Sequence, residues 1–475
     1  MAAPPSALQR LADWAAALQV DAVPEPVLLH ARLQALGVLG LAGALGAEGA
    51  EAAGLASAAE ADPWMPLSGG AFAAVVGALA PPQPRRLNDV LVAIVAANEV
   101  SGRVGLAQAL GPRGWALRAQ TAGVAAAVAR GRAQGLDGRA LAGRIGAALC
   151  QSPPPTPGLG LRLAVDAAVR GLGDGVWDVD LDQPGPLMPA PVLLRAAWTG
   201  LGRAWLSRAL VHRPHPGPLR AQVPLQALNE VLRRHVKAAE KRLRADQIER
   251  IELKVGGGAV GERAAQGWPA GAASLGQLAG ALVVGHSLEL GGLRDAMAQA
   301  ERVAAVAACV QVHPDPVRAM LTPLSLLSAM PQLLGGLPWA ERARAAGQLL
   351  RGSSAALAPK WWRGLPEVPV EGLMSALRGA GEDLGDARLE ELILRFDTEL
   401  VVHTTRGGAW RERRDRLRGG PGAPWAETVD DTVARAAAGL GGAPAGVERA
   451  RAAFEAHGAT EAAAWAAPWL APRPA

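Results

Sequence analysis

Hydrophobic residues recur every three or four positions through most of the first 210 residues. The spacing is clearest in Val27–Leu45, Val90–Leu110, Ala119–Arg132 and Arg139–Cys150. It places apolar side chains on one face of an α-helix, and Gly135 and the proline cluster Pro153–Pro157 are typical helix stops. The pattern therefore predicts an α-helical domain over residues 1–210.

The pattern changes after residue 210, where an amphipathic helix is predicted up to Lys237. Ile248–Val255 alternates apolar and charged residues, as a half-buried strand does. Leu394–Thr405 and Trp410–Leu417 are predicted as two further strands joined by a glycine-containing turn. Helices are predicted over Leu278–Met297 and Ala300–Cys309, and beyond Trp425 the helical pattern returns. These features predict a smaller α+β domain after the first helical one.

Length, composition and charge narrow the class of protein. A chain of 475 residues fits two domains, and 50% apolar with 19% charged residues is typical of a folded globular protein. A net charge of +5 is too dilute for a nucleic-acid surface. The longest apolar run, Leu36–Ala47, is too short to span a bilayer, and Met1–Gln9 lacks a secretory signal. We expect a cytoplasmic protein that binds neither nucleic acid nor membrane.

Residue usage also limits the chemistry. The chain has no tyrosine, which excludes mechanisms that need a phenol as acid, base or hydrogen-bond donor. Cys150 and Cys309 lie in alanine-rich stretches, where we expect buried reduced thiols, and no metal-ligand spacing surrounds them. The glycine strings at 158–160 and 256–258 lack the strand-turn-helix context of a dinucleotide site. We expect neither a metal nor a cofactor.

Several segments in sequence order carry a resemblance. Leu87–Trp115 holds Glu and Arg on one predicted helix, and Gln120–Asp137 follows with a TAG string, an alanine-rich helix and a GLD string. Leu11–Gly43 forms a leucine-rich helical start, RPHPGPLRAQVPLQALNEVL spans Arg213–Leu232, and a hairpin spans Thr398–Trp425. Together these segments resemble the MmgE/PrpD family, the scaffold of 2-methylcitrate dehydratase and cis-aconitate decarboxylase.

The resemblance implies a mainly α protein. Its large all-helical domain is built from both chain ends, here residues 1–210 and 423–475. A smaller α+β lid domain spans residues 211–422, with a helical insertion around 321–380. The resemblance also implies a cleft between the domains, a homodimer, and cofactor-free removal of water or carbon dioxide from small tricarboxylates. That chemistry needs a base near the proton α to a carboxylate, an acid for the leaving group, and cations that hold the carboxylates.

Most of the positions that the family uses for this chemistry are changed here. Ala71–Arg86 contains no His, Asp or Glu, although the family carries a loop with Asp and a His-Pro-Gly string there. The family's catalytic His, Lys and second His fall at about Leu117, near Gly160 and at Arg220, and its usual Asp near the start is Gln34. No histidine lies between His30 and His212. We therefore expect a catalytically degenerate protein.

Two groups of residues are nevertheless candidates for a site. His212, His215 and Arg220 form a compact His/Arg group where the family's lid meets its cleft, and we predict a catalytic or carboxylate-binding role. A solvated proline-rich loop is the alternative. Arg118 and Gln120 precede the TAG helix, whose N-terminal amides attract anions. Arg162 stands near the lost lysine, although an ion pair with Asp166 explains it better. The predicted substrate-binding residues are Arg118, Gln120, Arg162 and Gln222.

Other polar residues have structural explanations. Glu99 and Arg103 lie four residues apart on one predicted helix, where a surface or interhelix ion pair is the favoured interpretation. His286 is expected at a helix end. The remaining histidines are scattered without a metal-binding or catalytic spacing; they are His30, His235, His313, His403 and His457.

Three functions stay open from sequence. The first and favoured one is a catalytically degenerate lyase-family protein, acting as a partner or regulatory subunit, as a homodimer or as a heterodimer with an active homologue. The second is an active lyase with a rebuilt site for a small di- or tricarboxylate. The third is a non-catalytic carboxylate-binding protein.

Overall fold

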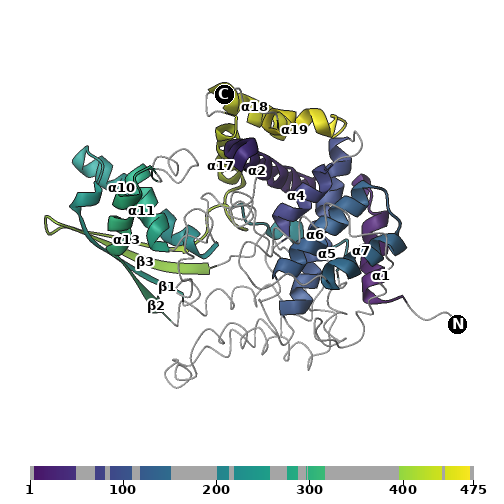
Figure 1. Cartoon of the computed structure of the whole chain (residues 1–475), viewed down its shortest axis with the longest axis horizontal. Coiled ribbons are helices and arrows are strands. Elements are labelled where there is room, and N and C mark those ends of the chain that lie inside the picture. The colour runs from purple at the N-terminus through teal and green to yellow at the C-terminus, as the bar shows by residue number, and fades with distance from the viewer. Residues whose placement is uncertain are drawn as a thin grey trace, which may run out of the picture.

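A computed structural model describes the protein in residues 5–49, 70–80, 86–109, 118–150, 200–212, 219–256, 275–286, 296, 298–315, 395–440 and 444–470. This part of the chain is mainly helical and contains a four-stranded mixed sheet (Figure 1). The sequence prediction of a mainly α protein is confirmed for these residues. The predicted insertion around residues 321–380 lies outside the described residues.

The N-terminal helices follow the apolar periodicity of the sequence. They are α1 (Ala7–Ala17), α2 (Glu25–Gly49), α4 (Ala71–Leu79), α5 (Leu87–Ala109), α6 (Arg118–Ala133) and α7 (Gly138–Cys150). Ser6 caps α1 by accepting a hydrogen bond from the Gln9 amide at 3.2 Å, and Asp137 accepts one from the Ala140 amide at 2.8 Å in the first turn of α7. Gly135, at φ +71°, follows the end of α6.

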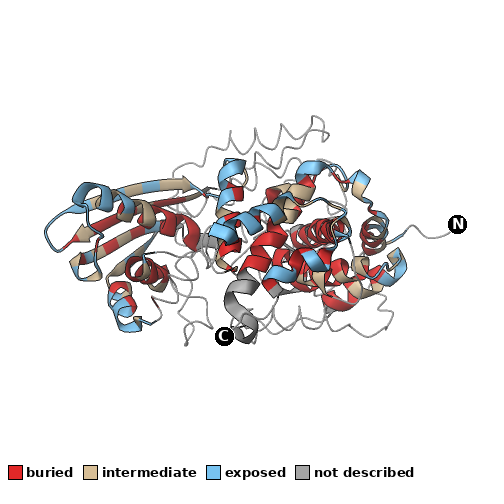
Figure 2. Ribbon diagram, turned by 90° about the horizontal axis from the view of Figure 1, so that it is seen from above, coloured by how far each residue is buried: buried red, intermediate tan, exposed pale blue. Residues whose placement is uncertain are grey.

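The C-terminal helices pack against these N-terminal helices. They are α17 (Trp425–Ala438), α18 (Pro444–Glu455) and α19 (Ala462–Leu470), and all three contact α2. Trp469 donates from Nε1 to the carbonyl oxygen of Ala436 at 2.9 Å, and a guanidinium nitrogen of Arg32 donates to that of Phe454 at 2.9 Å. Helices from both ends of the chain therefore share one hydrophobic core, shown in red in Figure 2.

A second core lies between a sheet and three helices. The strands are β1 (Ile248–Gly256), β2 (Val310–Asp315), β3 (Arg395–Thr404) and β4 (Ala409–Arg416), in the order β2-β1-β3-β4. β1 pairs in parallel with β2 and antiparallel with β3, and β3 and β4 form an antiparallel hairpin. Helices α10 (Leu219–Ala239), α11 (Leu275–Gly285) and α13 (Ala300–Ala308) lie on one face of this sheet (Figure 1).

Three expectations about local structure need correction. The helix predicted over Leu278–Met297 ends at Gly285, because His286 adopts the left-handed φ of +58°. The strand β2 follows α13 directly and was not predicted. Cys309 is a free thiol as expected, but it is half-buried rather than buried. The side chain of Cys150 lies outside the described part of the chain.

Candidate functional site

His212, a predicted catalytic residue, lies at the junction between the helical core and the hairpin strands. It follows the short helix η3 (Leu206–Ala209), and its amide donates to the carbonyl oxygen of Gly419 at 2.8 Å. Gly419 is just beyond β4 and adopts φ +78°; a Cβ there would overlap the carbonyl oxygen of His212. This close backbone approach fixes His212, whose side chain is buried with only 2% of the residue exposed.

His30 on α2 and Trp425 at the start of α17 complete an aromatic cluster with His212. The His30 and His212 rings are stacked, with centroids 5.9 Å apart and an interplanar angle of 29°. The Trp425 ring centroid lies 4.4 Å from that of His30. The sequence shows no metal-binding or catalytic spacing around His30 and gives no sign of this contact. The neighbour of His30 is far away in the chain, so no local spacing indicates the pairing.

Both imidazoles are neutral at physiological pH. Burial, and to a smaller extent the positive charge of Arg435, lowers the pKa of His212 to about 3. Burial is also the main reason that the pKa of His30 falls to about 3, with smaller effects from His212 and Arg208. Two neutral rings can stack without electrostatic repulsion, and each offers one hydrogen-bond donor and one acceptor.

Several ring nitrogens of this cluster form no hydrogen bond within the described part of the chain. Within the described part of the chain, neither ring nitrogen of His212 has a hydrogen-bond partner, and neither does Nδ1 of His30. A buried polar atom without a partner costs about 1–3 kcal/mol. Positive charges act on both rings, that of Arg208 on His30 and that of Arg435 on His212.

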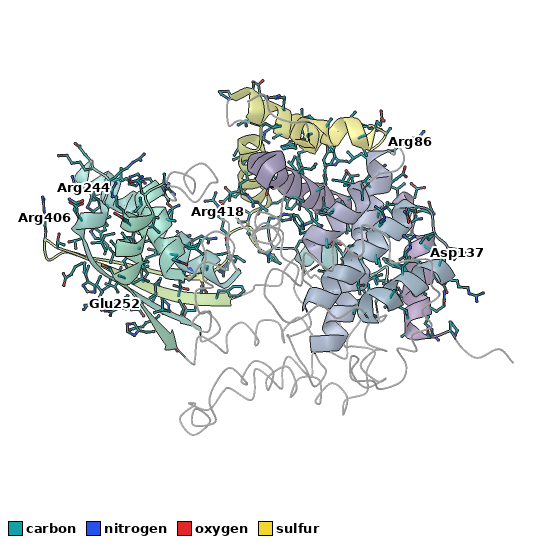
Figure 3. The ribbon with its side chains drawn as sticks, viewed as in Figure 1. Arg86, Asp137, Arg244, Glu252, Arg406 and Arg418 are labelled. Carbon is teal, nitrogen blue, oxygen red and sulfur yellow. The ribbon has the colours of Figure 1, made fainter. Side chains whose placement is uncertain are left out.

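Arg435, whose charge acts on His212, lies on α17 one turn after Asp431. A guanidinium nitrogen of Arg435 donates to the Thr432 hydroxyl at 3.1 Å. Asp431 accepts from Arg418 at 2.8 Å, and Figure 3 shows Arg418 between the two parts of the molecule. Burial raises the pKa of Asp431, although Arg418 and Arg435 act in the opposite direction. The carboxylate of Asp431 thus belongs to an ion pair with Arg418.

Glu99 and Arg103 form an ion pair, as the sequence interpretation favoured, but the pair is buried within α5 rather than at the surface or between helices. The Glu99 carboxylate lies 2.5 Å from the Arg103 guanidinium and accepts hydrogen bonds from the amides of Leu206 and Ser207 at 3.0 and 2.8 Å. It also accepts the Ser207 hydroxyl at 2.9 Å, and Arg103 donates to the Ala204 carbonyl oxygen at 2.8 Å. The pair therefore anchors the segment that leads to His212.

The side chain of Gln34 is also used in internal hydrogen bonds. Its Nε2 donates to the carbonyl oxygen of Ala71 at 2.7 Å, and its amide exchanges hydrogen bonds of 2.7 and 3.1 Å with Asn98. Gln34 and Asn98 are both 0% exposed. An amide in this position cannot act as a proton acceptor in place of a carboxylate.

Of the other predicted site residues, the structure describes some only by their backbone and others not at all. Three positions lie outside the described residues: His215, Arg162 and Asp166, the residue expected to form an ion pair with Arg162. Arg118 and Gln120 lie in the first turn of α6 rather than ahead of it, which corrects the expectation. Arg220 belongs to the first turn of α10. The side chains of Arg118, Gln120 and Arg220 lie outside the described set.

Gln222 is described in full and is buried in α10, with 0% exposure. His286 lies at the end of α11, as expected. Of the predicted site residues, the structure thus gives side chains only for His212 and Gln222, and His30 is the neighbour of His212 that sequence reasoning missed.

The described ranges contain neither a metal-binding cluster nor a membrane-spanning helix. There, no group of three or more His, Cys, Asp or Glu side chains is arranged to hold a metal ion. None of the helices in these ranges combines the length and apolar character that crossing a membrane requires. Comparison with known proteins finds no family whose model matches this chain and no curated protein that matches it.

Proposed function

We propose that this chain is a catalytically degenerate protein on the MmgE/PrpD-type lyase scaffold. In this proposal, the core shared by α2 and α17–α19 is the family's helical domain, and the sheet with α10, α11 and α13 is its lid. The packing of both chain ends into one core supports the proposal. So does the position of His212 between η3 and the residue after β4. The protein is proposed to be cytoplasmic and dimeric, with itself or with an active homologue.

The main observation in favour of a loss of catalysis is the low pKa and the burial of His212. A general base works best when its pKa is near the working pH, because it must hold the proton that it removes. The pKa of His212 is lowered to about 3 by burial, so its protonated form is strongly disfavoured at neutral pH. Its side chain is also closed off from solvent. These properties suit a structural or binding group better than a proton acceptor.

Three further features support the loss of catalysis. Residues Ala71–Leu79 form the buried apolar helix α4, where the family carries the start of its Asp and His loop. Gln34 is a hydrogen-bonded amide in place of an aspartate. Glu99 is a buried carboxylate, but its oxygens are occupied by Arg103 and by the backbone of η3. None of these groups is available to abstract a proton.

A second candidate function is binding of a small carboxylate without turnover. The specific observation in its favour is that both ring nitrogens of His212 and Nδ1 of His30 are buried without a hydrogen-bond partner in the described part of the chain, in the positive field of Arg208 and Arg435. A carboxylate bound there accepts imidazole N–H bonds and gains from both positive charges. This function uses the same scaffold and needs no proton transfer.

A combined turnover and calorimetry screen tests the proposal. The purified protein is incubated with citrate, 2-methylcitrate and cis-aconitate, with His212→Asn as the site variant and His313→Asn, an exposed position on β2, as the control. The degenerate function predicts no product in any reaction. Turnover that His212→Asn removes and His313→Asn keeps contradicts it. Heat of binding without turnover, lost in His212→Asn, identifies the carboxylate-binding function.

A further inference from the structure

A basic surface lies on the helical side of the α+β part. Two adjoining hollows of about 320 and 560 Å³ share Arg242 and His286 in their walls. Six basic side chains line them, from the end of α10, the loop after it, the end of α11 and the start of α13; they are Arg233, Lys237, Arg242, Arg244, His286 and Arg302. No Asp or Glu is among the described residues that line either hollow. We call this surface the basic hollow.

The charges of the basic hollow are less compensated than those on the neighbouring sheet. On the sheet, basic residues have acidic partners, as in Arg250–Glu252 at 2.8 Å and Arg413–Asp397 at 3.1 Å. In the hollow, Arg233 pairs with Glu230 at 3.6 Å, and Arg244 pairs with Asp246, whose carboxylate is also affected by the charge of Arg302. Lys237 and Arg242, however, form no ion pair with any described acid, and both are exposed. Like charges repel each other, and an anion bound between them offsets this repulsion. This surface therefore favours an anionic ligand.

Arg242, His286 and Arg302 line the same hollow, the larger of the two. The pKa of His286 is lowered by partial burial and, in addition, by the charges of Arg242 and Arg302. Arg242 comes from the loop after α10 and Arg302 from the first turn of α13. Both guanidinium groups are therefore close enough to His286 to affect its charge. An anion bound beside His286 interacts with both guanidinium groups at once.

The backbone adds to the positive character of the basic hollow. His286 adopts φ +58°, an uncommon conformation for a residue with a side chain, and such strain is found most often at binding sites. Ala298 and Gln299 line the second hollow directly before α13, which begins at Ala300. The N-terminus of a helix carries a partial positive charge and binds phosphate groups.

We propose that the basic hollow binds a small molecule that carries two or more phosphate groups. Two connected hollows that share Arg242 and His286 give room for more than one phosphate. Guanidinium groups and a helix N-terminus are the groups that proteins commonly use for phosphate. The site is formed by α10, α11 and α13, and it is independent of the His30–His212 cluster and of the function proposed for that cluster.

Calorimetric titration with tripolyphosphate tests this site. The wild-type chain is expected to bind one tripolyphosphate saturably, and the double variant Arg242→Ala/Arg302→Ala to bind at least about tenfold more weakly, since each charged hydrogen bond contributes more than 1 kcal/mol. The matched control is Arg406→Ala/Arg411→Ala, which removes the same charge at exposed positions of the hairpin that line neither hollow. The control is expected to bind like the wild type.

Three outcomes of the titration overturn the proposal. They are an absence of saturable binding, equal weakening by the control variant, and binding of citrate as tight as that of tripolyphosphate. An NMR titration of the wild type gives a readout that is independent of the variants. Tripolyphosphate is expected to raise the pKa of His286, whose signal is identified by its loss in His286→Gln. An unchanged pKa for His286 at saturating tripolyphosphate also contradicts the site.

Discussion

The rings of His30 and His212 stack with their centroids 5.9 Å apart, although one residue lies on α2 and the other follows η3. The contact joins the first helices of the chain to the residue whose backbone is held by Gly419, after the last strand of the sheet. It is stable only while both imidazoles are neutral, because two imidazolium ions at this distance repel each other. Lowering the pH is therefore expected to destabilise the junction through protonation of these two residues.

Acidification is expected to destabilise the protein through this pair. The pKa of each ring is about 3 in the folded protein and 6.5 when unperturbed. Between these values the unfolded chain binds more protons than the folded one, so the free energy of unfolding falls as the pH falls. Each histidine is expected to remove about 2 kcal/mol between pH 7 and pH 5. Urea unfolding at both pH values measures the effect.

The double variant His30→Leu/His212→Leu should lose most of this additional sensitivity to acid. His313→Leu is the control, because His313 is exposed on β2 and its replacement leaves the buried pair intact. If the double variant and the control lose stability equally between pH 7 and pH 5, the two buried imidazoles are not the cause.

Replacing Glu99 by glutamine tests the structural role of the buried ion pair. The change leaves the Arg103 guanidinium without its carboxylate in a fully buried position, where it is 1% exposed. Loss of one partner of a buried pair costs about 3 kcal/mol or more. Glu448→Gln on the exposed side of α18 is the control, expected to change the free energy of unfolding by less than about 0.5 kcal/mol. Equal urea midpoints for the two variants argue against the anchoring role.

Gly419 and Gly407 give a matched pair of left-handed glycines. Their φ angles are +78° and +81°, so alanine is strained at both positions by about 1 kcal/mol. At Gly407 a Cβ meets no atom within 4 Å, whereas at Gly419 it overlaps the carbonyl oxygen of His212. Gly419→Ala should therefore be clearly less stable than Gly407→Ala in thermal unfolding. Similar melting temperatures would show that the backbone contact with His212 is not tight.

Gly40 tests the packing of the two chain ends. A Cβ at Gly40 overlaps the backbone of Ala436 on α17, whereas at Gly131 the nearest atom is a methyl group of the Leu141 side chain, which can move. Alanine favours a helix over glycine by about 1 kcal/mol. Gly131→Ala should be neutral or stabilising, but Gly40→Ala should destabilise the protein and speed proteolytic removal of α17–α19. Equal proteolysis rates in the two variants contradict a shared core.

Helices and strands with a clear period were predictable from sequence. The apolar repeats of α5 and α6 gave nearly correct bounds, and the alternation of Ile248–Val255 gave β1. The strand β2 was missed because it is short and follows α13 with no turn signal. It is held in the sheet by parallel pairing with β1, a contact that local sequence does not indicate. The end of α11 depends on a left-handed histidine, a conformation that residue type alone does not predict.

The candidate site was less predictable than the fold. His212 was singled out by its proximity in sequence to other basic residues, but its contact is His30, which only the packing of α2 brings near. The Glu99–Arg103 pair was predicted from its i, i+4 spacing. Its further partners, the amides of Leu206 and Ser207, depend on long-range folding. Burial, which sets the pKa of both histidines, is likewise a property of the assembled core.

Solvent deuterium exchange tests the central claim, the loss of proton-abstracting chemistry, most directly. The protein is incubated in D₂O with citrate and 2-methylcitrate, and NMR follows deuterium entering the carbon next to a carboxylate, which detects proton removal even without product release. The account predicts no exchange above that of buffer. Exchange that the wild type catalyses, that His313→Asn retains and that His212→Asn abolishes would contradict it and identify His212 as a working base.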